Sequence, residues 1–175
     1  MKILGICGSP RKGNTEFLLR EALKAAREKG AETELILLRE KRIEHCDGCL
    51  KCDETGECHI RDDMQEIYNK LEDADTIVLA SPNYYENVTG LFKDFIDRMN
   101  PYYTSKKLKG KKVGIIGVGG GSGKDVIKII KGVCNALQMD VIQSIEFGIG
   151  NNPTNASKNK KAIEKSRKLG ESLTK

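Results

Sequence analysis

The sequence contains no tryptophan and only two histidines, and aromatic residues make up just 5% of its 175 residues. No apolar run approaches the length needed to span a bilayer, and 31% of the residues are charged. The first apolar run, residues 3–7, gives way at once to Gly8, Ser9 and Pro10, which is too early for a signal peptide. We therefore expect a cytoplasmic protein that does not interact with membranes.

The chain also lacks a strong excess of charge of one sign. Its 30 Lys and Arg residues against 25 Asp and Glu residues give a net charge of +5, spread along the sequence apart from a lysine-rich stretch at 158–168. That stretch is typical of the solvent-facing side of a helix, so we expect no nucleic-acid partner. No low-complexity segment is present, and the length suits a single domain comprising residues 1–175.

Six cysteines stand out in a chain expected to occupy a reducing compartment, where a disulfide framework is disfavoured. Four of them, Cys46, Cys49, Cys52 and Cys58, lie in the cysteine loop, residues 45–60, at C-x2-C-x2-C-x5-C spacing. Intervals of two residues recur in iron-sulfur ligation. Zinc sites usually split four cysteines into two separated C-x2-C pairs. The spacing favours an iron-sulfur cluster, with zinc or free and redox-active thiols as alternatives.

The remaining cysteines and the two histidines have plainer interpretations. His45 and His59 adjoin the outermost cysteines of the loop, either as hydrogen-bond donors to sulfur or as chance neighbours. Cys7 precedes a helix N-terminus, where a thiol pKa can be lowered, but a small buried residue is the favoured interpretation. Cys134 shares a helix face with apolar residues and is expected in the core.

Hydrophobic periodicity predicts five strands that alternate with helices. The expected strands are residues 2–7, 32–38, 76–80, 113–118 and 140–147, and the expected helices are 14–29, one opened by Asp62 and Asp63 with Gln65 and Glu66 as capping-box partners, 91–99, 126–137, and one closing helix from Ala156. This alternation predicts an α/β three-layer sandwich with a parallel sheet covered on both faces. The flavodoxin-like strand order 2-1-3-4-5 fits the count and puts a ligand at the carboxyl ends of the strands.

The loop after the first strand, residues 8–15, is equipped to hold a phosphate. It joins a strand to the positive end of a helix and carries Arg11 with the hydroxyls of Ser9 and Thr15. A plain turn with Asn14 as the helix N-cap is the alternative. The loop lacks the G-x-x-x-x-G-K-[ST] and G-x-G-x-x-G patterns, so a dinucleotide bound in the Rossmann manner is poorly supported.

The loops after the third and fourth strands, residues 81–90 and 119–125, are expected to meet the first at the same edge of the sheet. The second of these has four glycines in five residues, which suits either close approach of a flat or anionic ligand or a flexible turn. We expect a mononucleotide with its phosphate on residues 8–15. Its ring would then lie against residues 81–85 and the glycines.

Taken together, GSPRKGNTE, the cysteine motif followed by IRDDM, SPNYY leading to GLFKDFIDR, and GVGGG resemble the iron-sulfur flavoproteins. These belong to the flavodoxin-like group of FMN-dependent reductases, and the resemblance extends from Met1 to about Gly150. It implies FMN bound at the phosphate by Ser9, Arg11, Asn14 and Thr15, and at the ring by Pro82, Asn83, Tyr84, Gly120 and Gly121. It also implies a [4Fe-4S] cluster on Cys46, Cys49, Cys52 and Cys58, and assembly as a homodimer or homotetramer.

The function expected from this resemblance is electron transfer. A cluster passes single electrons and a flavin stores one or two, so the pair couples a one-electron donor such as ferredoxin to a small-molecule acceptor. No side chain is required as an acid or base. Two alternatives stay open: an NAD(P)H-dependent FMN or quinone reductase whose cysteines are structural or redox-active, and a zinc-stapled binding protein with ordinary glycine turns. The loop is expected to leave from the flavin edge of the sheet, toward its own flavin or a partner's.

Overall fold

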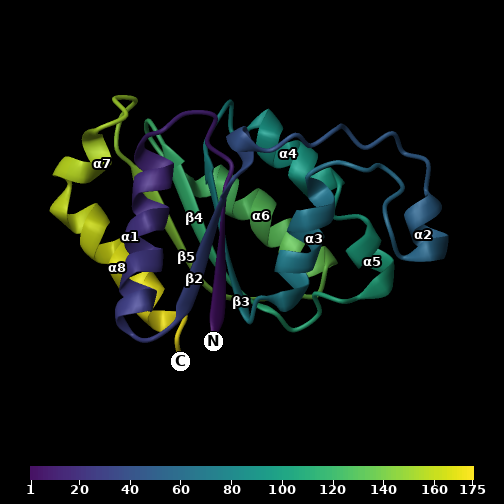
Figure 1. The fold of residues 1–175 in the computed structure, drawn as a ribbon. Helices are drawn as coiled ribbons and strands as arrows, with labels where there is room; N and C mark the ends of the chain where they lie inside the picture. The colour runs from purple at the N-terminus through teal and green to yellow at the C-terminus, as the bar shows by residue number, and fades with distance from the viewer.

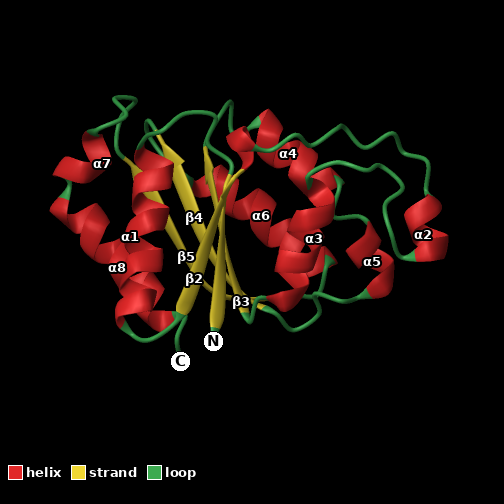
Figure 2. Ribbon diagram, viewed as in Figure 1, coloured by secondary structure: helices red, strands yellow, loops and turns green.

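The computed structural model describes residues 1–175 and contains one five-stranded sheet between two layers of helices (Figures 1 and 2). The strands are β1 (Lys2–Cys7), β2 (Glu32–Leu37), β3 (Thr76–Pro82), β4 (Lys112–Gly119) and β5 (Asp140–Gly148). They pair in the order β2-β1-β3-β4-β5 and are all parallel, as predicted. Their carboxyl ends therefore share one edge, the upper edge in Figure 1.

Eight α-helices and one short 3₁₀ turn, Leu38–Glu40, connect and cover the strands. The helices are α1 (Asn14–Glu28), α2 (Lys51–Thr55), α3 (Met64–Asp73), α4 (Gly90–Asp97), α5 (Pro101–Ser105), α6 (Lys124–Ala136), α7 (Asn155–Lys158) and α8 (Lys160–Ser172). In Figure 1, α1, α7 and α8 lie on one side of the sheet, and α3, α4 and α6 lie on the other. None of them combines the length and hydrophobicity needed to cross a membrane.

The sheet buries a separate hydrophobic core on each face. Along β1, Leu4 and Ile6 join the core under α3, α4 and α6, whereas Ile3 and Cys7 join the core under α1 and α8. Strands buried on both faces explain why the sequence shows continuous apolar runs in place of alternation. Each fully buried Leu or Ile side chain contributes about 1.5–3 kcal/mol relative to exposure to water. Cys134 is fully buried, which confirms its predicted place in the core.

Two helix caps considered from the sequence, the Asn14 cap as an alternative and the capping box of α3 as a prediction, are absent. The residue before α1 is Gly13, and no side chain caps the helix. The predicted capping box of α3 is also missing: Gln65 Nε2 donates to Ile60 O at 2.9 Å, and Glu66 pairs with lysines. The backbone N–H of Met64 instead donates to Asp62 Oδ1 at 3.0 Å. These side chains are engaged by the neighbouring loop, which local helix signals do not reveal.

The chain also breaks where one closing helix was expected. Helix α7 ends before Asn159, and the Asn159 side chain accepts a hydrogen bond from Ala162 N at 3.1 Å to start α8. An asparagine side chain that caps a new helix in this way favours a break over continuation of the preceding helix. Strand β3 continues to Pro82, beyond the predicted end at Ala80, and carries the chain further into the upper edge of the sheet.

Candidate functional site

A narrow cleft opens at the carboxyl edge of the sheet. Loops that follow β1, β3, β4 and β5 supply its walls. The lining residues are Ser9, Arg11, Asn14, Thr15, Pro82, Asn83, Tyr84, Val118, Gly119, Gly120, Gly150 and Asn151. Eight of the nine residues that the family resemblance implies for FMN thus lie around one cleft, and Gly121 does not line it.

One end of the cleft suits an anion. Arg11 is the only charged residue that lines it, and its Nη2 donates to Asn151 O at 3.1 Å across the opening. The Ser9 hydroxyl donates to Arg11 O at 2.7 Å and so fixes the loop. Because no side chain caps α1, the N–H groups of its first turn stay free, and the helix dipole makes this end positive.

The Asn14 side chain holds two walls of the cleft together. Its Nδ2 donates to Asn152 O, and its Oδ1 accepts from Ala156 N, both at 2.9 Å. Both ends of the amide are therefore used to dock the segment after β5 against the start of α1. Sequence reasoning missed this segment, although its Gly-Asn-Asn-Pro pattern follows a strand at the same edge as the other three loops.

The other end of the cleft offers a free acceptor. Asn83 N donates to Val118 O at 2.6 Å, and Asn83 Nδ2 donates to Ser122 O at 2.9 Å. Its side-chain oxygen Oδ1 is buried and has no hydrogen-bond partner in the chain. An unsatisfied buried acceptor costs about 1–3 kcal/mol. A ligand with an N–H group, such as the flavin ring, would satisfy it.

The glycine turn after β4 is tight for two reasons. A Cβ atom on Gly120, which lines the cleft, would come within 2.5 Å of Asn151 Oδ1. The carbonyl oxygen of Gly121 lies 1.8 Å from the place a Cβ on Gly148 would take. The glycines therefore serve close packing of the turn as well as the wall of the cleft.

Tyr84 leads into a two-residue turn beside the cleft. Its backbone N–H and C=O pair with Asn87 at 2.9 and 3.0 Å. The turn residues Tyr85 and Glu86 have φ values of 50° and 60°, in the left-handed region that side chains other than Gly and Asn rarely adopt. Tyr85 is fully exposed at the tip.

The cysteine loop runs away from this cleft. It starts near the upper edge of the sheet, passes the α3 and α4 side, reaches α2 at the opposite end of the molecule from α7, and then returns toward α3 (Figure 1). Cys46 and Cys49 are exposed, Cys58 is half-buried, and Cys52 is buried, with Asn100 Nδ2 donating to its Sγ at 3.1 Å. The cysteines therefore do not face the cleft of their own chain.

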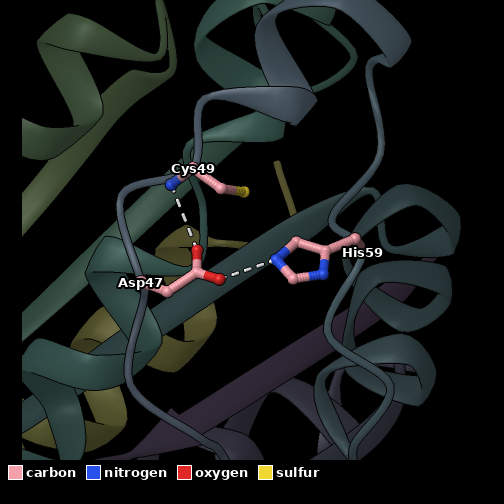
Figure 3. A group of neighbouring side chains, drawn as sticks. All are labelled: Asp47, Cys49 and His59. Carbon is pink, nitrogen blue, oxygen red and sulfur yellow. Dashed lines mark hydrogen bonds and ion pairs between the residues drawn. The ribbon is translucent and has the colours of Figure 1, made fainter.

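The four sulfur atoms do not form a closed tetrahedron. In a structural Cys₄ zinc site with Zn–S bonds of about 2.3 Å, the sulfurs lie about 3.8 Å apart. Here the only group of three or more potential metal ligands within 4.8 Å of one another is Asp47, Cys49 and His59 (Figure 3). No three of the four thiols belong to one such group.

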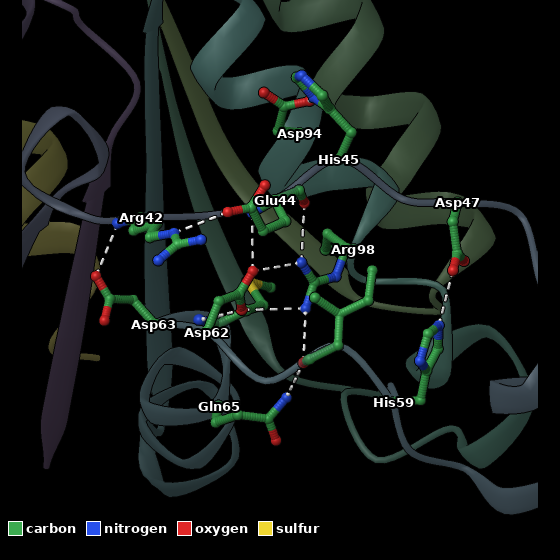
Figure 4. Close-up of polar contacts among 12 residues, drawn as sticks. Arg42, Glu44, His45, Asp47, His59, Asp62, Asp63, Gln65, Asp94 and Arg98 are labelled. Atoms are coloured by element: carbon green, nitrogen blue, oxygen red, sulfur yellow. Dashed lines mark hydrogen bonds and ion pairs between the residues drawn. The ribbon is translucent and has the colours of Figure 1, made fainter.

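A buried ion pair closes the base of the loop (Figure 4). The fully buried Arg98 guanidinium binds both oxygens of Asp62, at 2.6 and 3.1 Å. The same guanidinium donates to Glu44 O at 2.9 Å and to Ile60 O at 3.2 Å, on the two ends of the loop. Asp62 Oδ2 also accepts from Glu44 N at 2.8 Å. Arg98 and Asp62, here called the loop clamp, thus join both ends of the loop to α4.

The two histidines pair with carboxylates, and no hydrogen bond joins either of them to a sulfur. His45 Nδ1 lies 2.6 Å from Asp94 Oδ1, and His59 Nε2 lies 2.8 Å from Asp47 Oδ2 (Figure 4). The hydrogen bond and negative charge of Asp94 raise the pKa of His45. The first pair joins the start of the loop to α4, and the second joins two segments within the loop.

Comparisons with known proteins agree with the predicted family. The family described as NADPH-dependent FMN reductase matches residues 1–154. An iron-sulfur flavoprotein of Archaeoglobus fulgidus is 49% identical over 125 residues, which cover 71% of this chain and 57% of that relative. An iron-sulfur flavoprotein of Clostridioides difficile is 30% identical over 165 residues, which cover 87% of this chain and 71% of that relative.

A solved structure supports the fold. A flavodoxin from the domain Archaea superposes with a TM-score of 0.68 at 17% identity, covering 99% of this chain and 96% of that one. This likeness confirms the predicted flavodoxin-like architecture. Together with the family match over residues 1–154, these similarities show that the chain belongs to the NADPH-dependent FMN reductase family and, within it, to the iron-sulfur flavoproteins.

Proposed function

We propose that the chain is an FMN-dependent oxidoreductase of the cytoplasm that also carries a [4Fe-4S] cluster on Cys46, Cys49, Cys52 and Cys58. A ferredoxin-like protein is the proposed one-electron donor, and a small molecule is the proposed acceptor. The observation that carries the proposal is the loop clamp: a fully buried ion pair holds both ends of a segment whose notable content is four cysteines. The chain spans 57% of its Archaeoglobus relative, so the activity of longer relatives is not assumed for it.

The cleft residues fit FMN. Arg11 and the free N–H groups of α1 would hold the phosphate, and the unpaired oxygen of Asn83 would accept a hydrogen bond from a ring N–H. Gly120 has no side chain to keep a flat ring away from the backbone. When bound, FMN accepts and releases one or two electrons, and the cluster exchanges them one at a time.

The other role proposed for residues of this chain is to hold the cysteines in position. The loop clamp fixes where the cysteines begin and end, and Asn100 supplies an amide N–H to the Cys52 sulfur. Hydrogen bonds of this kind orient a ligand and tune the centre that it binds. No side chain is given a proton-transfer role.

The position of the loop bears on assembly. Because the cysteines lie away from their own cleft, the proposal includes a homodimer or homotetramer in which the loop of one copy meets the cleft of another. A monomer in solution at micromolar concentration, measured by light scattering on protein with both cofactors, would contradict this part of the proposal.

A second candidate function follows from the family description. An NAD(P)H-dependent FMN or quinone reductase needs only the cleft, and its cysteines would be structural or redox-active. An anaerobic absorption spectrum, with iron, sulfide, zinc and FMN contents, separates the candidates. A broad band over flavin peaks with four irons per chain supports the cluster protein. Flavin peaks alone support the reductase, and stoichiometric zinc without flavin would overturn both.

Replacing Cys49 by alanine tests the cluster ligands. We expect Cys49→Ala to lose most of its iron while retaining FMN, because the cleft shares no residue with the loop. Cys134→Ala is the matched control, since it removes an equivalent thiol from the core and should keep its iron. Iron at the wild-type level in Cys49→Ala would remove Cys49 from the ligand set.

Replacing Arg11 by alanine tests the phosphate end of the cleft. Arg11→Ala should weaken FMN binding by about 10- to 100-fold, the scale of about 1.5–3 kcal/mol for a hydrogen bond to a charged group, without changing the iron content. Lys12→Ala is the control, because Lys12 carries the same charge on the same loop but does not line the cleft. Equal flavin affinity in wild type and Arg11→Ala, measured by fluorescence titration, would refute the assignment.

A further inference from the structure

The cysteine loop holds a group of potential ligands in which Asp47 and His59, two residues that four-cysteine coordination does not use, lie beside Cys49. Asp47, Cys49 and His59 each direct one potential ligand atom to a common point, with these atoms within 4.8 Å of one another (Figure 3). His59 Nε2 and Asp47 Oδ2 are 2.8 Å apart. The other carboxylate oxygen, Oδ1, accepts a hydrogen bond from Cys49 N at 3.1 Å, which orients the carboxylate.

The charges of this group favour a cation. The negative charge comes from the Asp47 carboxylate, and no lysine or arginine forms a salt bridge with it. All three side chains are at the surface, so a metal ion can reach them without any opening of the core.

The combination of atoms matches zinc. Zn²⁺ takes sulfur at about 2.3 Å, imidazole nitrogen at about 2.0–2.1 Å and carboxylate oxygen at about 2.0–2.2 Å, which puts neighbouring ligands about 3.3–3.6 Å apart. The three atoms here lie within 4.8 Å of one another, and His59 Nε2 and Asp47 Oδ2 are already closer than that spacing. Three protein ligands leave a fourth position for water.

We propose that the cluster-free chain binds one zinc-type divalent ion through Asp47, Cys49 and His59. The ion takes the place of the hydrogen that neutral His59 holds on Nε2 toward Asp47. That proton is transferred through solvent to Nδ1 of the same ring, so the imidazole releases no net proton. The Cys49 thiol gives its proton to solvent as the S–metal bond forms. Binding therefore releases one proton for each metal ion.

This site competes with the proposed cluster for Cys49. A bound ion withholds one of the four thiolates and blocks cluster assembly until the ion leaves. This consequence rests on the proposed cluster, whereas the site itself does not, so metal titration and cluster reconstitution test them separately.

Anaerobic titration of the full chain, freed of iron by a chelator, tests the site with Co²⁺ as a coloured substitute for zinc. We expect one Co²⁺ per chain, visible bands of four-coordinate cobalt, a charge-transfer band for one thiolate, and one proton released. Asp47→Ala and His59→Ala should each weaken binding at least about tenfold, since even loss of an outer hydrogen bond costs about 10- to 100-fold. Zn²⁺ should displace the cobalt.

Cys52→Ala is the matched control because Cys52 lies in the same loop but contacts Asn100, away from the three ligands. Its Co²⁺ affinity should equal that of the wild type. Binding that survives Asp47→Ala and His59→Ala but is lost in Cys52→Ala, with more than one thiolate in the charge-transfer band, would overturn the proposal in favour of a tetrathiolate site. Absence of stoichiometric binding in the wild type would also overturn it.

Discussion

Replacing Arg98 by methionine should destabilise the chain by about 3–5 kcal/mol, the cost of leaving one member of a buried ion pair without its partner. Methionine keeps much of the buried volume, so the loss is mainly that of charge and hydrogen bonds. The Arg98 side chain is 0% exposed and that of Asp62 is 2% exposed. The substitution also removes the guanidinium donors to Glu44 O and Ile60 O.

A double-mutant cycle separates the interaction energy of the Arg98–Asp62 pair from the effect of each substitution on packing. Asp62→Asn leaves the Arg98 charge unpaired, whereas the double mutant with Arg98→Met leaves no uncompensated charge. We expect the double mutant to be more stable than the sum of the single effects predicts, by about 0.5–3 kcal/mol. Urea unfolding of the cluster-free chain, followed by circular dichroism, gives each free energy of unfolding.

An exposed pair on the same helix supplies the control. Lys93 and Asp97 form an i,i+4 salt bridge with side chains 55% and 41% exposed. Lys93→Met should therefore change the free energy of unfolding by no more than about 0.5 kcal/mol. A cost below about 1 kcal/mol for Arg98→Met, or additive single effects, would refute the role given to the loop clamp.

The same experiment has a pH dependence with a definite sign. Burial raises the pKa of Asp62, but hydrogen bonds from Arg98 and from the backbone N–H groups of Glu44 and Met64 outweigh it and hold the pKa below its ordinary value of 3.8. A depressed native pKa contributes stability above the unfolded value, and this contribution is lost as the pH falls through the native value. The difference between wild type and Arg98→Met should therefore shrink in acid.

Two further predictions concern thiols and a turn. Burial raises the pKa of Cys7 to about 11 and that of Cys134 to about 12. Both thiols should therefore resist iodoacetamide in the folded chain at pH 8 and react only after unfolding. Rapid labelling of Cys7 in the folded chain, detected by peptide mapping, would contradict this. Replacing Tyr85 by Asn together with Glu86 by Gly should raise the free energy of unfolding by about 1–2 kcal/mol. A left-handed backbone costs residues other than Gly and Asn about that much. An unchanged free energy of unfolding in urea would argue against strain in the turn.

Most of the fold was accessible from sequence because parallel strands leave an unmistakable pattern. Residues 3–7 and 113–118 contain only apolar residues and glycine since both faces of the sheet are covered. Glycine-rich or polar loops mark their carboxyl ends, so three walls of the cleft could be predicted together. The break at Asn159 and the extension of β3 to Pro82 depend on local hydrogen bonds that periodicity does not report.

The determinants of the cysteine loop were not accessible in this way. Arg98 ends an amphipathic helix, where a charged residue is usually solvated, and Asp62 stands where an acidic residue usually caps a helix. Their pairing joins positions 36 residues apart and gives both a role that neither local pattern contains. Asn151 was missed for a similar reason, since only the docking of residues 150–156 on Asn14 brings it to the cleft.

The loop clamp separates folding from cofactor loading. In a zinc finger the metal supplies the folding free energy, and its removal unfolds the domain. Here the ion pair between Arg98 and Asp62 offsets the entropy cost of closing the loop, and neither residue is a proposed ligand of the cluster. We therefore expect maturation to follow an order: the polypeptide folds first, the loop waits in a restricted shape, and iron enters last. Oxidative loss of the cluster would then be reversible, because the cluster-free chain stays folded and can accept a new cluster.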